Sequence, residues 1–153
     1  MLDLNVFEKE VSKPRAFAGA TTHARGDDGG TNDPFTLFNV TGTVLVRVFG
    51  VCTDSLTGAS ATIEVGVTGN TAALIAQETA TDIDVGGIYL SATQVLGAVA
   101  FSSVTGPFVV ANGLDIIETV GTDNVTGGNV YYVCLWKPLS NDGKVQAAGN
   151  AGF

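Results

Sequence analysis

Apolar and polar residues alternate along much of the chain after residue 34. In the segment 62–68, Ile63, Val65 and Val67 fall on one side of an extended backbone, and Thr, Glu and Gly occupy the other side. A period of two is typical of an antiparallel β-strand that has one face in the core and one face in solvent. The pattern therefore predicts a half-buried strand here.

Two further segments are apolar on both faces. The segment 44–52 is interrupted only by Arg47, and the segment 130–136 contains no charged residue. A strand of this kind is either central to a sandwich or placed at a subunit contact. The residues predicted to lie in the core or at a subunit interface are Val44, Val46, Val48, Tyr131, Tyr132 and Trp136.

Glycine-containing turns divide the chain into many short strands. Further strands are predicted at residues 35–41, 71–76, 87–90, 98–104, 108–110 and 114–120. Residues 71–76 also suit a short helix, but they follow a turn signal and no residue supplies a helix stop, so a strand is favoured. Short strands at this spacing predict an all-β fold, an antiparallel β-sandwich or jelly roll.

The two ends of the chain differ in composition from the middle. Residues 1–34 mix charge with small residues and include a run rich in Gly and Asp at 23–34, so they have few large apolar groups to offset the entropy of ordering. We predict an extended N-terminal arm at 1–34, a β-sandwich core at 35–140 and a flexible C-terminal tail at 141–153. Removal of residues 1–30 is then expected to leave the core folded.

Charge is distributed unevenly along the chain. The net charge is −8, only 14% of the residues are charged, and no Lys, Arg or His occurs between Val48 and Trp136. Enzymes usually keep a cationic or imidazole group near the reacting atoms, so an enzyme, a cofactor and a metal ion are not expected. An acidic chain is also a poor partner for nucleic acid or an anionic membrane. A weakly charged surface favours association with other proteins.

Four of the seven basic residues fall in the predicted arm. Lys9, Lys13, Arg15 and Arg25 are therefore predicted to contact acidic patches on a partner. The two cysteines, Cys52 and Cys134, lie in separate strand-like segments outside any metal-binding motif, and buried free thiols are favoured over a disulfide.

Two groups of side chains could form a catalytic or ligand-binding site, but each has a simpler structural interpretation. Asp82 and Asp84 would project from one face of a strand, as a hydrolase or cation site requires, but a solvated strand edge is favoured. Tyr131, Tyr132 and Trp136 would stack on a sugar if they were exposed together, but core packing is favoured for aromatic residues with apolar neighbours.

The segments 41–85 and 112–141 together resemble small virion structural proteins encoded among the head genes of tailed bacteriophages. The resemblance implies a capsid decoration, or cement, protein: a homotrimer of β-sandwich modules that binds the major capsid protein in the assembled shell. It also implies synthesis in the cytoplasm of a bacterial host and a final location on the capsid surface. The alternative expectation is a tail or fibre module that binds glycans on the host surface.

Overall fold

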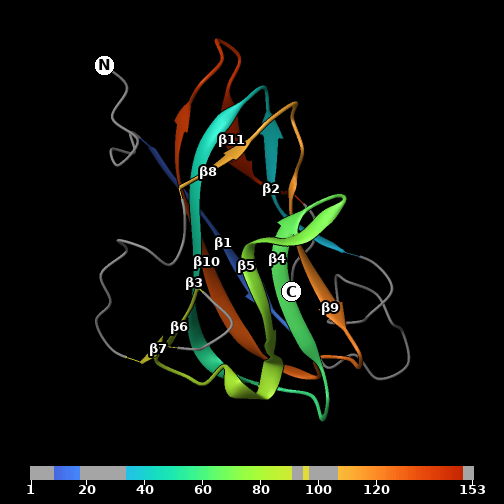
Figure 1. The fold of residues 1–153 in the computed structure, drawn as a ribbon. Coiled ribbons are helices and arrows are strands. Elements are labelled where there is room, and N and C mark those ends of the chain that lie inside the picture. The colour runs from blue at the N-terminus through green and yellow to red at the C-terminus, as the bar shows by residue number, and fades with distance from the viewer. Residues whose placement is uncertain (1–8, 18–33, 91–94, 97–106, 150–153) are drawn as a thin grey trace.

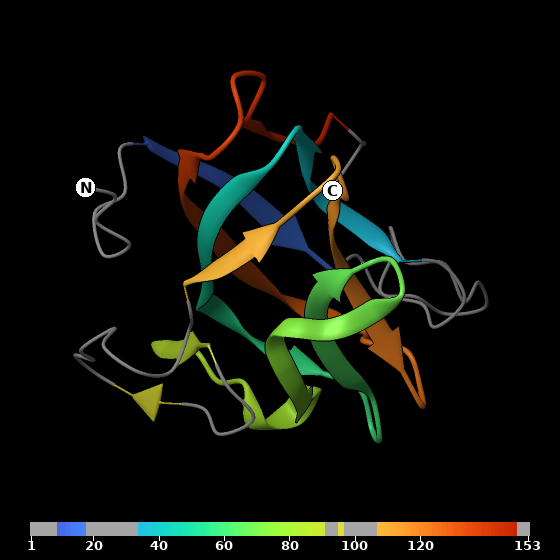
Figure 2. The same ribbon diagram turned by 45° about the horizontal axis from the view of Figure 1, so that its top comes forward.

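The computed structural model describes residues 9–17, 34–90, 95–96 and 107–149 (Figure 1). These residues form two antiparallel sheets, called sheet A and sheet B. Sheet A has the strand order β1-β10-β3-β6-β7, with β8 also paired to β3, and sheet B has the order β11-β2-β9-β4-β5. The two sheets lie on opposite sides of the core in Figure 2, so the predicted all-β, antiparallel sandwich class is confirmed.

The strands have the following bounds. Sheet A contains β1 (Lys9–Ala16), β3 (Val44–Thr57), β6 (Gly87–Tyr89), β7 (Val95–Leu96), β8 (Phe108–Val110) and β10 (Gly127–Pro138). Sheet B contains β2 (Phe35–Thr41), β4 (Thr62–Val67), β5 (Asn70–Thr79), β9 (Ile116–Gly121) and β11 (Lys144–Ala147). A short 3-10 helix, η2 (Ala80–Asp82), follows β5.

Alternation along the strands fills the space between the sheets. In β3, Val44, Val46 and Val48 are at most 1% exposed, and in β4 Ile63 and Val65 are fully buried. Each large aliphatic side chain removed from water in this way contributes about 1.5–3 kcal/mol. The period of two seen in the sequence is therefore the pattern that builds the core.

Most of the predicted strands are confirmed. Residues 35–41 form β2 at the predicted bounds, and residues 71–76 lie within β5 and are not helical. β3 and β10 extend beyond the predicted segments, because they pair with each other from Gly127 to Pro138 through a bulge near Asn129. The predicted strand at 98–104 lies outside the described residues.

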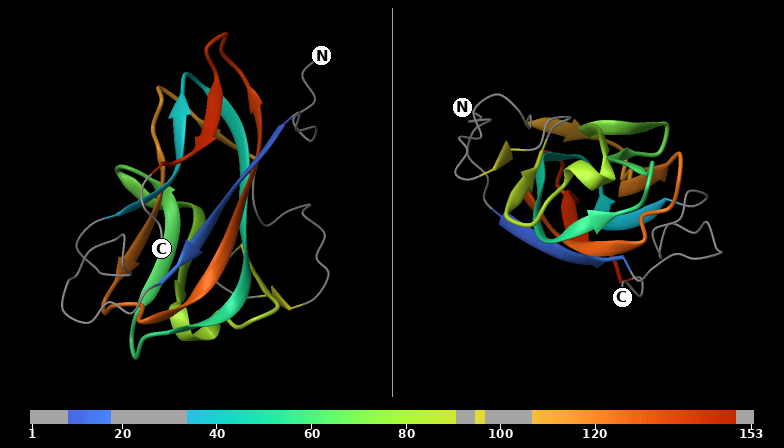
Figure 3. Two further views of the ribbon diagram at one scale, coloured as in Figure 1. Left: turned by 180° about the vertical axis from the view of Figure 1, so that it is seen from behind. Right: turned by 90° about the horizontal axis from the view of Figure 1, so that it is seen from below.

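The predicted division into arm, core and tail requires two corrections. Lys9–Ala16 is not part of an arm outside the body, because it forms β1 and pairs residue by residue with β10 (Figure 3). Lys144–Ala147 is not part of a flexible tail, because it forms β11, pairs with β2 and buries Val145. The remaining residues of the predicted arm and tail lie largely outside the described residues.

Candidate interaction surface

The six residues predicted for the core or a subunit interface divide between two faces of sheet A. Tyr132 is fully buried and Trp136 is 6% exposed, so both belong to the core with the three valines of β3. Tyr131 lies on the opposite face and is 42% exposed. The three aromatic residues therefore cannot form one sugar-stacking platform, and core packing is confirmed for Tyr132 and Trp136.

The predicted basic contacts are not gathered on an arm. Lys9 places its Nζ atom 5.3 Å from the centre of the Trp136 ring, and Lys13 donates a hydrogen bond from Nζ to the carbonyl oxygen of Ala148 at 2.8 Å. Arg15 is 1% exposed, so its predicted role as a contact to a capsid is wrong. Arg25 lies outside the described residues.

Arg15 is instead the cation of a buried polar network that joins the two sheets. Its Nε atom donates to Glu118 Oε1 at 2.9 Å, and both side chains are fully buried. The guanidinium carbon lies 4.1 Å from the centre of the Phe17 ring and 4.0 Å from that of Phe35, so it is enclosed between two aromatic rings. Tyr132 donates its hydroxyl proton to Glu118 Oε2 at 2.7 Å. The network links β1 and β10 of sheet A to β9 of sheet B.

The Tyr132 hydroxyl group donates a hydrogen bond to the buried Glu118 carboxylate. We expect Tyr132→Phe to lower the free energy of unfolding by about 1–3 kcal/mol, because a buried acceptor loses its donor. Tyr131→Phe is the matched control: its hydroxyl donates to Ser12 Oγ at 2.6 Å on the exposed face, so a smaller loss is expected. Urea unfolding of both variants measures the difference, and equal losses would contradict the assignment.

Burial raises the pKa of Tyr132 and of Tyr89 well above the ordinary value of 10.0, and the Glu118 carboxylate raises both further. The folded protein therefore keeps these phenols protonated at a pH where the unfolded chain releases their protons. The stability that they contribute is complete below about pH 10 and is lost as the pH rises.

We accordingly expect alkaline destabilisation of about 1.4 kcal/mol per pH unit for each of the two tyrosines above pH 10. Urea unfolding measured at increasing pH tests this. Tyr132→Phe is expected to reduce the loss of unfolding free energy per pH unit by the contribution of one tyrosine. A midpoint that stays constant through this range would show that the phenols are not protected.

The two cysteines are free thiols and both are buried, as predicted. Burial raises the pKa of Cys134, and burial is also the main cause of the raised pKa of Cys52. Because the thiolate is the reactive form, both side chains are protected from alkylation and oxidation in the folded protein. They act as small core residues.

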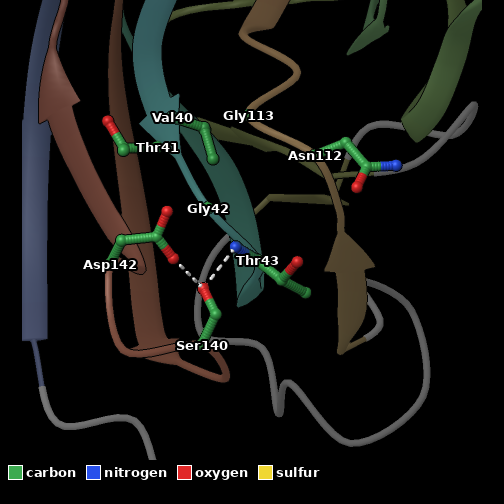
Figure 4. Close-up of a pocket in the computed structure, with 8 residues that line it drawn as sticks. All are labelled: Val40, Thr41, Gly42, Thr43, Asn112, Gly113, Ser140 and Asp142. Atoms are coloured by element: carbon green, nitrogen blue, oxygen red, sulfur yellow. Dashed lines mark hydrogen bonds between the residues drawn. The ribbon is translucent and has the colours of Figure 1, made fainter.

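A polar pocket of about 590 Å³ lies where three turns meet (Figure 4). Ser140 Oγ donates to Asp142 Oδ1 at 2.6 Å and accepts a hydrogen bond from the Thr43 amide at 2.8 Å. Gly42 has a φ of +63°, and a Cβ atom there would collide with the Asp142 side chain. The polar groups thus fix the turns to each other. The lining residues are Val40, Thr41, Gly42, Thr43, Asn112, Gly113, Ser140 and Asp142.

The predicted carboxylate pair does not lie on a strand. Asp82 ends the 3-10 helix η2 and Asp84 follows it, so the two side chains do not share a strand face. Among the described residues no three His, Cys, Asp or Glu side chains are grouped as a metal site would require. None of the helical structure described is long and apolar enough to span a membrane.

The outer face of sheet A is the largest departure from the usual alternation. Directly paired residues share a face, so Pro14, Tyr131 and Val51 form one row across the sheet, and Ser12, Val133 and Phe49 form the next. We define the outer face of sheet A as Glu10, Ser12, Pro14, Leu45, Arg47, Phe49, Val51, Ile88, Val109, Tyr131, Val133, Leu135 and Lys137.

The outer face of sheet B shows the contrast. Its paired residues are mostly polar. Ile117 is a large apolar residue on this face, and it is only 5% exposed. The polar residues on it are Thr36, Asn39, Thr41, Thr62, Glu64, Thr119, Lys144 and Gln146. A sandwich of two antiparallel sheets normally presents polar outer faces on both sides. Sheet B follows this rule, and sheet A does not.

An apolar hollow of about 130 Å³ adjoins the outer face of sheet A at β8. Val109 is shared by the hollow and the face and is 60% exposed, and Leu114 on the rim is 40% exposed. On the face itself Tyr131 is 42% exposed, and Leu45 is only 2% exposed. The half-buried apolar residues of the face are Phe49, Val51, Ile88, Val133 and Leu135. Apolar surface that stays partly accessible over several strands marks a protein interaction site. The outer face of sheet A is therefore the candidate interaction surface.

Comparison of the chain with protein-family models, with curated proteins and with solved structures finds no match.

Proposed function

We propose that the protein is a structural module of a bacteriophage virion, a capsid decoration protein that works as a homotrimer. The observation that carries the proposal is the apolar outer face of sheet A, because a rigid sandwich with one apolar and one polar outer face suits a part of a larger assembly. The segments that resemble head proteins contain β3, β4 and β5 and, in the second half, β9 and β10. They therefore include both strands that build the centre of this face.

The proposed mechanism is stabilisation by mass action. A protein that binds the assembled shell, and not its free subunits, makes the shell harder to open by a free energy that grows with its concentration. The major capsid protein is the proposed partner. Arg15 is buried, and Lys13 is half-buried and bonded to the carbonyl oxygen of Ala148. Lys9 and Arg25 are therefore the predicted contact residues that remain proposed for an acidic shell.

The proposal is tested by locating the chain in the particle. Virions from the source of this sequence are expected to contain many copies, and electron cryomicroscopy is expected to show them on the outer capsid surface after synthesis in the bacterial host. Density in the tail would overturn the decoration role and favour the tail or fibre module that binds host glycans. Absence from purified particles would overturn both.

A further inference from the structure

We infer that the outer face of sheet A is buried against further copies of this same chain. The inference deepens the proposed function by assigning the surface through which the homotrimer forms. Only the number of copies, three, rests on the proposed function. The occupant is a second copy, and the contact is made by the middle rows of β10 and β3.

Composition is the first argument for self-association. The central rows of the face carry Tyr131, Val133 and Leu135 from β10 and Phe49 and Val51 from β3. Subunit interfaces in homo-oligomers are more apolar than transient ones and are rich in aromatic residues. Tyr131 is 42% exposed and the other four side chains are half-buried, so a second protein surface can remove further apolar area from water. Another copy of the chain is the partner always present in equal amount.

Charge is the second argument. The chain carries a net charge of −8, so two copies repel each other unless their acidic groups point away from the contact. The outer face of sheet A carries one carboxylate, Glu10, against two basic groups, Arg47 and Lys137. It is therefore a surface at which two acidic chains can approach without a large electrostatic cost.

The positions of these charges also suit a closed ring. Glu10, Leu135 and Arg47 stand in one row across three neighbouring strands, with the acid on the edge strand β1 and the base on β3. When the β1 side of one face meets the β3 side of the next, acid approaches base around the apolar centre. A head-to-tail contact of this type closes into a ring when the rotation permits, as in a trimer.

The test uses the full chain, its oligomeric mass in solution and two substitutions in the face. Wild-type protein is expected to sediment as a homo-oligomer. Val133→Glu and Val133→Lys are expected to weaken self-association by about 100-fold, because Val133 lies between Ser12 and Phe49 and either charge must be buried unpaired in an apolar contact. Since the two substitutions have opposite sign, a shared loss separates burial of an apolar surface from charge repulsion.

Ala76→Glu is the matched control, because Ala76 is exposed on β5 of sheet B and the change adds the same charge. It is expected to leave the mass unchanged, and circular dichroism verifies that all three variants stay folded. A monomeric wild-type protein, or an oligomer that survives both face substitutions, would overturn the inference. If the wild-type protein is a monomer that binds shells, and its face variants no longer bind them, the inference is overturned and the face is assigned to the shell contact.

These outcomes are independent of the particle experiment. A monomeric virion protein keeps the location on the capsid surface but removes the homotrimer and this inference. An oligomer that is absent from virions keeps the inference and removes the virion role.

Discussion

Replacing Arg15 with methionine is expected to lower the free energy of unfolding by about 3–5 kcal/mol. Methionine keeps an unbranched apolar side chain but removes the guanidinium group that lies between Phe17 and Phe35. Glu118 is then left as a buried charge that still accepts the hydrogen bond from the Tyr132 hydroxyl. Domains of this size are stable by about 5–15 kcal/mol, so the loss is a large part of the total. Urea unfolding of the purified variant measures it.

Two further variants identify the cause of that loss. Arg15→Met combined with Glu118→Leu removes both charges and is expected to recover most of the stability, because an apolar pair can replace a buried ion pair at little cost. Lys9→Met changes an exposed base on the same strand and is expected to shift stability by less than about 1 kcal/mol. A double variant no more stable than Arg15→Met would show that the packing of the guanidinium, and not the unpaired carboxylate, dominates.

The central strands were predictable because each carries its own signal. In β4 the alternation of valine and isoleucine with other residues shows which side chains face the core, and no knowledge of the partner strand is required. For β3 and β10, which are apolar on both faces, the same signal did not show which side chains face the core and which face outward. The structure separates Tyr132, which faces the core, from Tyr131, which faces outward, because neighbouring residues of a strand point to opposite faces.

The terminal strands were not predictable in this way. β1 contains two lysines, an arginine, a glutamate and a proline, a composition that local rules assign to a loop. Its stability comes from β10, more than a hundred residues away in the chain, and from aromatic rings that lie against the cationic ends of its basic side chains. Charged residues and proline also protect an edge strand from unwanted pairing, so the composition suits its place at the edge of sheet A.

The buried network left one trace in the sequence. Glu118 lies between Ile116 and Val120 on the side of β9 that faces the core, where the alternation calls for an apolar residue. A carboxylate at such a position requires a buried partner, but the sequence contains seven basic residues and does not identify which one. The pairing with Arg15 is fixed only when β1 takes its register on β10.

Deleting residues 1–17 is expected to prevent folding, in contrast to the outcome expected for a free arm. The deletion removes β1, exposes the edge of β10 and leaves Glu118 without its cation. We expect these losses together to exceed the stability of about 5–15 kcal/mol that is usual for a domain of this size. A chain that begins at residue 9 keeps β1 and is the matched control, expected to fold. Glu118→Leu placed in the shorter chain should restore part of its stability, because it removes the unpaired charge. Circular dichroism and urea unfolding of the three proteins give the result, and cooperative unfolding of the shorter chain at the wild-type midpoint would show that β1 is not an integral part of sheet A.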